Sequence, residues 1–216
     1  MERLQQYDVV VVGGGTAGVS AAVGAAKTGA KTLLIERNAY LGGEATNSGV
    51  SAFCGFYTCG ENPVRVVEGV GRLVLNEMEA LGPTVDYVIS ATGNRNINFQ
   101  PEYLKCAMDN LLEKERVDYL LHTSVIGADT ENGTITAIHC VDDEGTFTVA
   151  AKAFVDASGD ANLARLAGAH LVWGGDDGHQ LRYVSGCGGA CRCEGKRRRN
   201  PQPHKGEGLY LKKRRI

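Results

Sequence analysis

Three glycines at fixed spacing and one acidic residue are the part of this sequence best suited to bind a nucleotide. Gly13, Gly15 and Gly18 follow one apolar run, and Glu36 closes the next. The first glycine permits a sharp turn, the second lets a pyrophosphate approach the backbone, and the third lets a helix pack closely. The acidic side chain can accept hydrogen bonds from both hydroxyls of an adenosine ribose. The spacing therefore predicts a dinucleotide-binding turn.

The elements that would position this turn are also readable. The β-branched run Val9–Val12 is typical of a strand buried on both faces. An alanine-rich helix is expected at residues 16–29 and a second strand at 31–36. The N-terminus of that helix would direct N–H groups and a partial positive charge at the phosphates. A strand–helix–strand unit that binds no nucleotide is the alternative, because glycine-rich turns also occur for conformational reasons alone.

The rest of the chain alternates less regularly. Residues 37–49 are polar and glycine-rich and are expected to form a loop. Three strands, at 118–128, 134–141 and 146–151, are separated by strong turn signals and predict a β-meander. A further apolar strand is expected at 152–157. A plain NAD-binding domain would instead continue with alternating strands and helices.

Apolar periodicity predicts helices at residues 64–81 and 101–115.

Bulk composition adds limits on the class of protein. The hydrophobic fraction of 43% is normal for a globular protein. No apolar run approaches the roughly 18–20 residues that a membrane-spanning helix needs, so no membrane partner is expected. The polar N-terminus lacks signal-peptide features, which favours the cytoplasm. Seven cysteines, an odd and irregularly spaced set, are interpreted as reduced thiols.

Four blocks, taken in order, carry a family resemblance. They are residues 8–18, 35–37, 41–46 and 154–161. Their order and spacing resemble the FAD-dependent oxidoreductases, in the flavin domain shared by the glutathione-reductase and fumarate-reductase groups. The resemblance covers residues 7–175. It implies an α/β fold, a Rossmann-like FAD-binding domain with a parallel central sheet and an inserted three-stranded β-meander.

The resemblance implies FAD as cofactor and oxidoreductase activity on a small-molecule substrate, and it identifies no catalytic acid or base. The glycine turn would contact the pyrophosphate, Glu36 and Arg37 the adenosine, and Val125 the adenine through its backbone. For Asp160, capping of a short helix at 161–167 is an equal alternative to a cofactor contact. The residues that the resemblance assigns to FAD are Gly13, Gly15, Thr16, Ala17, Gly18, Glu36, Arg37, Gly43, Glu44, Ala45, Thr46, Val125, Ala157, Ser158, Gly159 and Asp160.

The last part of the chain differs sharply in charge. Residues 181–216 hold 11 Lys or Arg and two Asp or Glu, although the whole chain has a formal net charge of −2. We therefore expect a flavin domain at residues 1–178, with residues 50–100 as a partial cap or insertion. Residues 179–216 would form a basic tail without regular structure.

Three explanations of the tail stay open. The abrupt loss of apolar pattern favours a reading frame shifted or truncated after about residue 178, and a catalytically inactive remnant is then the alternative to an enzyme. A basic arm that binds nucleic acid is a second explanation. A metal knuckle built on Cys187, Cys191 and Cys193 is the third, although this spacing is not standard for zinc and no metal site is expected elsewhere.

Overall fold

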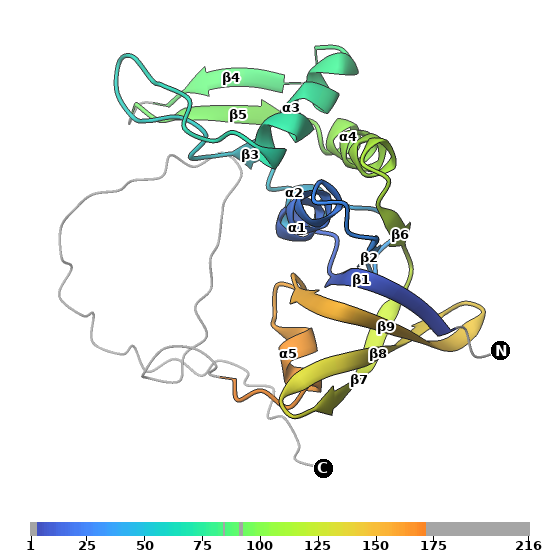
Figure 1. Cartoon of the computed structure of the whole chain (residues 1–216). Coiled ribbons are helices and arrows are strands. Elements are labelled where there is room, and N and C mark those ends of the chain that lie inside the picture. The colour runs from blue at the N-terminus through green and yellow to red at the C-terminus, as the bar shows by residue number, and fades with distance from the viewer. Residues whose placement is uncertain (1–3, 84, 91–92, 172–216) are drawn as a thin grey trace, which may run out of the picture.

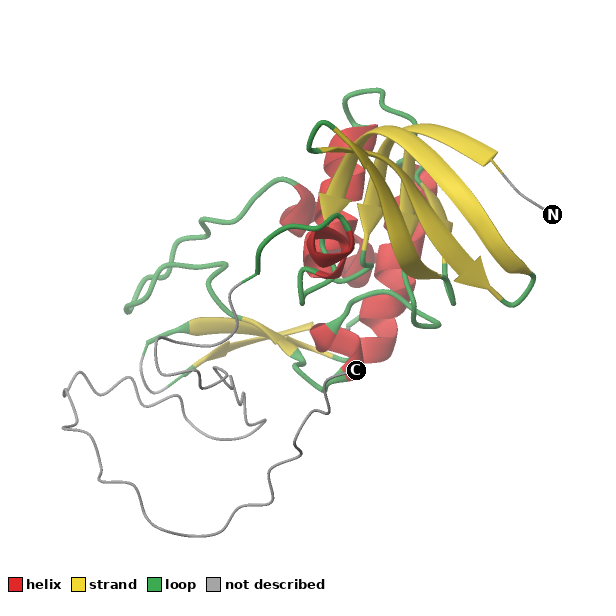
Figure 2. Ribbon diagram, turned by 90° about the horizontal axis from the view of Figure 1, so that it is seen from below, coloured by secondary structure: helices red, strands yellow, loops and turns green. Residues whose placement is uncertain are grey.

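The computed structural model describes residues 4–83, 85–90 and 93–171, which form two sheets with helices between them (Figures 1 and 2). The larger sheet has the strand order β6-β2-β1-β9-β8-β7 and the smaller one β3-β5-β4. The strands of the larger sheet are β1 (Leu4–Val12), β2 (Thr32–Ile35), β6 (Asp118–Leu120), β7 (Ser124–Glu131), β8 (Thr134–Asp142) and β9 (Gly145–Asp156). Those of the smaller sheet are β3 (Ala52–Phe53), β4 (Val85–Ile89) and β5 (Arg95–Phe99). The helices are α1 (Thr16–Ala26), α2 (Glu44–Asn47), α3 (Val70–Ala80), α4 (Pro101–Lys114) and α5 (Asn162–Leu166).

The larger sheet is parallel at its centre. Strands β6, β2, β1 and β9 run parallel, whereas β9, β8 and β7 pair antiparallel as a meander. The expected α/β fold, a parallel central sheet with an inserted three-stranded meander, is therefore confirmed. From β1 the chain moves to β2 on one side, and it returns at β9 on the other side. The carboxyl ends of these three strands consequently meet at one edge of the sheet.

The central strands are buried on both faces, which explains their uninterrupted apolar sequence. On one face Val11 and Leu34 belong to the core that contains α1, α3 and α4. On the other face Val10 packs in a second core with Ile138 and Val149 of the meander. Helix α1 lies between the two sheets (Figure 1). The glycine turn before α1 is thus fixed from two sides.

The structure corrects two of the strand predictions. The strand expected at 118–128 is interrupted, because His122 adopts a positive φ of 52° and its N–H donates to the Asn38 carbonyl at 3.1 Å. Its first part, β6, pairs with β2 and only its second part, β7, joins the meander. The strands expected at 146–151 and 152–157 are a single strand, β9, which pairs with β1 along most of its length.

The helix predictions need smaller corrections. The helix expected at 64–81 begins only at Val70, after Gly69, whose φ of 65° leaves the helical region. Val64, which was expected to begin this helix, makes a different hydrogen bond. Its carbonyl accepts from the Thr58 N–H at 2.8 Å. The loop expected at 37–49 contains the single turn α2. In contrast, α4 begins at Pro101, as its sequence predicted.

Candidate nucleotide-binding site

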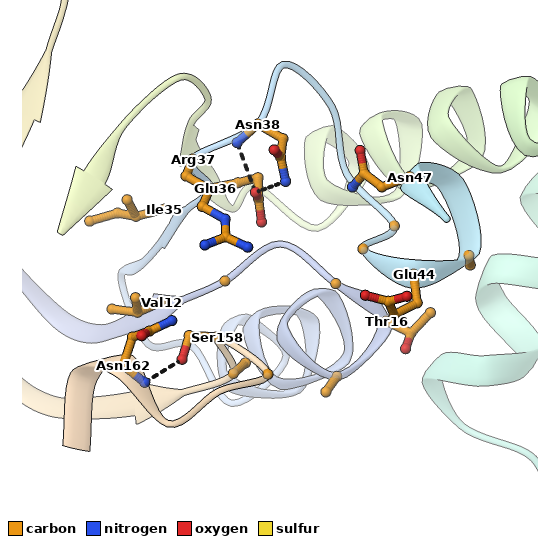
Figure 3. A pocket seen from close by; sticks show the side chains of 18 of the residues that line it. Val12, Thr16, Ile35, Glu36, Arg37, Asn38, Glu44, Asn47, Ser158 and Asn162 are labelled. Atoms are coloured by element: carbon orange, nitrogen blue, oxygen red, sulfur yellow. Dashed lines mark hydrogen bonds between the residues drawn. The ribbon is translucent and has the colours of Figure 1, made fainter. Parts of the chain in front are cut away.

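A cavity of about 750 Å³ opens at the carboxyl ends of β1, β2 and β9. This edge is the point where the chain order reverses across the sheet, the usual place for a ligand in an open α/β fold. Three segments supply most of the cavity lining, namely the glycine turn, residues 35–48 and residues 157–165, and Val50, Ala52, Phe53 and residues 123–125 complete it. Figure 3 shows side chains from all three converging on it.

Two glycines of the turn are required by the packing of the protein itself. Gly13 has a φ of 107°, and a Cβ on it would overlap with the carbonyl of Ala157. A Cβ on Gly18 would overlap with the carbonyl oxygen of Gly13. Gly18 is buried within α1 and does not line the cavity. Its role in the structure is therefore the close packing of α1 on the turn.

Gly15 is different, because no packing contact among the described residues requires a glycine there. Its φ of −70° suits any residue, and the nearest atom to a Cβ on it would be Gly43 Cα, at 3.8 Å. Gly15 lines the cavity directly before α1. The first turn of α1, Thr16–Gly18, carries no acidic side chain, and the first N–H groups of a helix lack intrahelical acceptors. The space beside Gly15 is thus suited to an anionic group that approaches the backbone.

The loop before α2 closes against the glycine turn. The Gly42 N–H donates to the Gly14 carbonyl at 2.8 Å, and Gly15 and Gly42 form an isolated parallel bridge. Gly43 has a φ of 55°, and a Cβ on it would lie 3.0 Å from Gly15 Cα. Thr46 is buried and its hydroxyl donates to the Leu41 carbonyl at 2.7 Å. Thr46 therefore braces the loop and does not line the cavity.

Glu36 lies at the end of β2 and only 6% of its surface is exposed. Its Oε2 accepts a hydrogen bond from the Gly14 N–H at 2.6 Å. Its Oε1 accepts two from Asn38, one from the backbone N–H at 2.8 Å and one from the side-chain amide at 2.7 Å. The two bonds from Asn38 are dashed in Figure 3, where the Arg37 guanidinium extends into the neighbouring space. The carboxylate is therefore held in one orientation at the cavity wall.

The third wall follows β9. The Ala157 N–H donates to the Val12 carbonyl at 2.8 Å, which extends the pairing of β9 with β1. Beyond it, Asp156 accepts hydrogen bonds from the Ser158 N–H and hydroxyl and from the Ala164 N–H, at 3.0, 2.6 and 2.8 Å. Burial alone would raise the pKa of Asp156, but these hydrogen bonds outweigh it and lower the pKa. The Ser158 hydroxyl also accepts from the Asn162 N–H at 2.8 Å.

Asp160 does not cap α5 in this structure. It is exposed and lies outside the cavity lining. The cap residue of α5 is Ala161, with a φ of 53° and no side-chain cap bond. Ser158 and Asp156 accept the N–H groups at this end of α5 instead. The cap prediction was wrong, because it assumed that the helix begins directly after Asp160.

Most of the residues expected from the sequence meet at the cavity. Those that line it are Gly13, Gly15, Thr16, Ala17, Glu36, Arg37, Gly43, Glu44, Ala45, Val125, Ala157, Ser158 and Gly159. Gly18, Thr46 and Asp160 do not. Sequence reasoning missed several polar lining residues, namely Asn38, Asn47, Ser124, Asn162 and Arg165. For Asn38, a signal was available in its position two residues after Glu36.

Two kinds of feature are absent from the described residues. Within residues 4–83, 85–90 and 93–171, no group of three or more His, Cys, Asp or Glu side chains is arranged to hold a metal ion. None of the helices in these ranges has the length and apolar character needed to cross a membrane. The predictions for residues 179–216, including the basic arm and the cysteine knuckle, lie outside the described residues.

Comparison with known proteins identifies relatives for most of the chain. Residues 8–196 match the family model described as FAD dependent oxidoreductase. Digeranylgeranylglycerophospholipid reductase of Thermoplasma acidophilum is 38% identical over 76 residues, which are 35% of this chain and 14% of that protein. The enzyme of the same name from Thermoplasma volcanium is 25% identical over 192 residues and covers 78% of this chain and 43% of that protein. The chain thus spans less than half the length of either relative.

A solved structure with a similar fold is that of a geranylgeranyl bacteriochlorophyll reductase-like protein from Thermoplasma acidophilum. It superposes with a TM-score of 0.54 and 23% identity, over 77% of this chain and 43% of that one. At this level of identity the likeness concerns the fold alone.

Proposed function

The chain belongs to the FAD dependent oxidoreductase family, whose cofactor is FAD, and on that premise we propose that its cavity binds FAD for redox chemistry on a small organic molecule. The bound flavin would supply hydride or electron transfer. The residues of this chain would bind the cofactor, orient it and keep water from part of its surface.

The space beside Gly15 is the observation that carries this proposal. Gly13 and Gly18 are glycines for reasons of folding, but Gly15 could carry a methyl group without contact inside 3.8 Å. A glycine that the protein does not need for its own packing indicates that a ligand comes close to the backbone there. The N-terminus of α1 makes an anion the fitting ligand, and the pyrophosphate of FAD is such an anion.

The cavity also suggests which way FAD would lie. Glu36, Arg37 and Val125 line the end that would take the adenosine. Val50 and the β3 residues Ala52 and Phe53 line a part formed by the other sheet, and the flavin ring would lie toward them. Phe53 stands within a ring cluster, with its centroid 4.5 Å from that of Phe99. An aromatic wall of this kind would exclude water from a flavin ring.

Flavin binding by the purified 216-residue chain tests the proposal. We expect yellow protein whose flavin is released on denaturation, and saturable binding when FAD is added to flavin-free protein. Gly15→Ala should weaken FAD binding by about tenfold or more, roughly 1.4 kcal/mol, because the new methyl group takes the space of the ligand.

Gly24→Ala is the matched control for that variant. Gly24 is exposed on α1 and a Cβ there would contact nothing within 4 Å. Its substitution should leave FAD affinity unchanged. A colourless chain that binds no added FAD would contradict the proposed function and favour a non-catalytic remnant. Equal affinity in Gly15→Ala and wild type would contradict the role given to Gly15.

A further inference from the structure

The Glu36 carboxylate is already occupied by hydrogen bonds from the protein. An ionised carboxylate offers about four acceptor sites, roughly two on each oxygen. The backbone and side-chain N–H groups of Asn38 take both sites on Oε1, and the Gly14 N–H takes one on Oε2. Within the part of the chain that the structure describes, one acceptor site on Oε2 is left for a ligand.

We propose that Asn38 is a positioning residue that restricts Glu36 to one hydrogen bond with adenosine. The side-chain amide of Asn38 saturates Oε1, so a bound adenine nucleotide contacts Glu36 through one ribose hydroxyl on Oε2. The other hydroxyl finds no free acceptor on this carboxylate. This inference rests on the proposed binding of FAD and replaces the expectation that Glu36 accepts both hydroxyls.

The backbone around the pair keeps this arrangement in place. The Glu36 N–H donates to the Leu120 carbonyl at 2.8 Å, and the Glu36 carbonyl accepts from the Thr123 N–H at 3.0 Å. The Asn38 carbonyl accepts from the His122 N–H at 3.1 Å. Both residues are therefore tied to the end of β6 and the short segment that follows it. A ligand that required Oε1 would have to displace one of two hydrogen bonds to a charged acceptor, and such bonds are stronger than neutral ones.

Packing restricts the carboxylate from the other side as well. A Cβ on Gly14 would lie 2.9 Å from Glu36 Cβ and 2.6 Å from Leu41 Cδ2. Glycine at this position, which the dinucleotide motif leaves unspecified, is what lets the Gly14 N–H reach Oε2. Both oxygens of the carboxylate are thus fixed by contacts that do not involve a ligand.

Binding of ADP, 2′-deoxy-ADP and 3′-deoxy-ADP to the flavin-free full chain, measured by calorimetry, tests the inference. In wild type, loss of one hydroxyl should weaken binding by about tenfold or more, roughly 1.4 kcal/mol. Loss of the other hydroxyl should change affinity by less than about twofold. Asn38→Ala frees one site on Oε1, so both deoxy analogues should then lose affinity to a similar extent.

The ratio between the two deoxy analogues is the decisive readout, because a general loss of stability would not change it. Asn47→Ala is the control, since Asn47 lines the cavity on α2 and should leave the ratio unchanged. Equal losses with both analogues in wild type, or an unchanged ratio in Asn38→Ala, would overturn the inference while FAD binding stands. The wild-type measurement can overturn the inference even if Asn38→Ala does not fold. A wild-type chain that binds neither FAD nor ADP would overturn the proposed function and this inference together.

Discussion

The glycines of the turn before α1 serve different purposes, although they look alike in the sequence. Gly13 and Gly18 are packed against backbone atoms, where no rotation of a side chain can relieve an overlap. Gly15 stands beside open space, and Gly14 lets its own N–H reach the Glu36 carboxylate. Substitutions at these positions should therefore separate folding from binding.

Gly18→Ala should damage folding. Its methyl group would overlap with the Gly13 carbonyl oxygen, so α1 must move away from the turn. Overpacking of a well-packed core typically costs about 1–3 kcal/mol, and we expect a loss at or above the top of this range. Urea denaturation of flavin-free protein measures it. Gly24→Ala should instead stabilise the chain by about 0.5–1 kcal/mol, because alanine favours an exposed helix interior. A Gly18→Ala variant as stable as wild type would contradict this account.

Cysteine reactivity gives a second prediction at this scale. Cys140 is fully buried in the core beneath the meander, and burial, with a smaller effect from Asp142, raises its pKa to about 12. The thiolate is the reactive form, so iodoacetamide at pH 8 should leave Cys140 unmodified in the native protein. The exposed Cys54, Cys59 and Cys106 should be alkylated. Peptide mapping checks this, and labelling of Cys140 at the rate of Cys106 would show that the second core is open.

Among the elements, the connection from β9 to α5 depends on one carboxylate. Asp156 accepts the Ser158 and Ala164 N–H groups and thereby joins the end of the strand to the helix. The Ser158 hydroxyl links the same turn to Asn162. Because Ala157 and Gly159 lie in this connection and line the cavity, its geometry affects the site.

Asp156→Ala should cost about 1–2 kcal/mol of unfolding free energy, since it removes a carboxylate that accepts backbone N–H groups near a helix start. The pKa of Asp156 is lower in the folded state than its ordinary value. Its stabilising contribution is therefore present above about pH 4 and is lost as pH falls through the lower folded value. Denaturation curves between pH 3 and pH 7 should show a smaller acid-induced loss in Asp156→Asn. Parallel pH profiles for the two proteins would be the contrary result.

Local signals predicted those elements whose ends are marked by particular residues. Pro101 marked the start of α4, and Gly133 and Gly145, both with positive φ, marked the meander turns. The division between β6 and β7 was not predicted, because it depends on the pairing of β6 with β2, far away in the chain, and on a positive φ at His122. Neither the pairing of β6 with β2 nor the positive φ at His122 is indicated by a local sequence pattern.

The same distinction applies to the site. The glycine turn and Glu36 were predicted because a bound dinucleotide calls for glycines and an acidic residue at this spacing. Thr46 was assigned to the cofactor, but the contact of its hydroxyl with the Leu41 carbonyl turns it into the loop. Asn38 was missed because its role depends on hydrogen bonds to Glu36, one from its backbone N–H and one from its side-chain amide, which the dinucleotide motif does not specify.

At the scale of the whole molecule, the central strands separate two cores. One contains α1, α3 and α4, and the other is covered by the meander. Both cores end at the edge where the cavity opens, so a ligand there would contact segments that belong to each. Ligand binding and global stability should therefore be linked.

FAD should raise the unfolding temperature of the chain. A ligand at 100 times its Kd stabilises the folded state by about 2.7 kcal/mol if it does not bind the unfolded state. We expect a rise that increases with FAD concentration, followed by circular dichroism or calorimetry. FMN, which lacks the adenosine that Glu36 and Arg37 would contact, should give a much smaller rise. An unfolding temperature that does not respond to saturating FAD would contradict the linkage.

Strand β9 has a consequence for the order in which the molecule forms. The turn at Gly13 rests against the Ala157 carbonyl, yet these residues stand near opposite ends of the described chain. Contacts between residues so distant in sequence form slowly, because the intervening loop must close first. A folding intermediate that contains only β1, α1 and β2 would have the glycine motif without its support. The ability to hold a nucleotide should therefore appear late in refolding, together with the docking of β9 and not with the first helix.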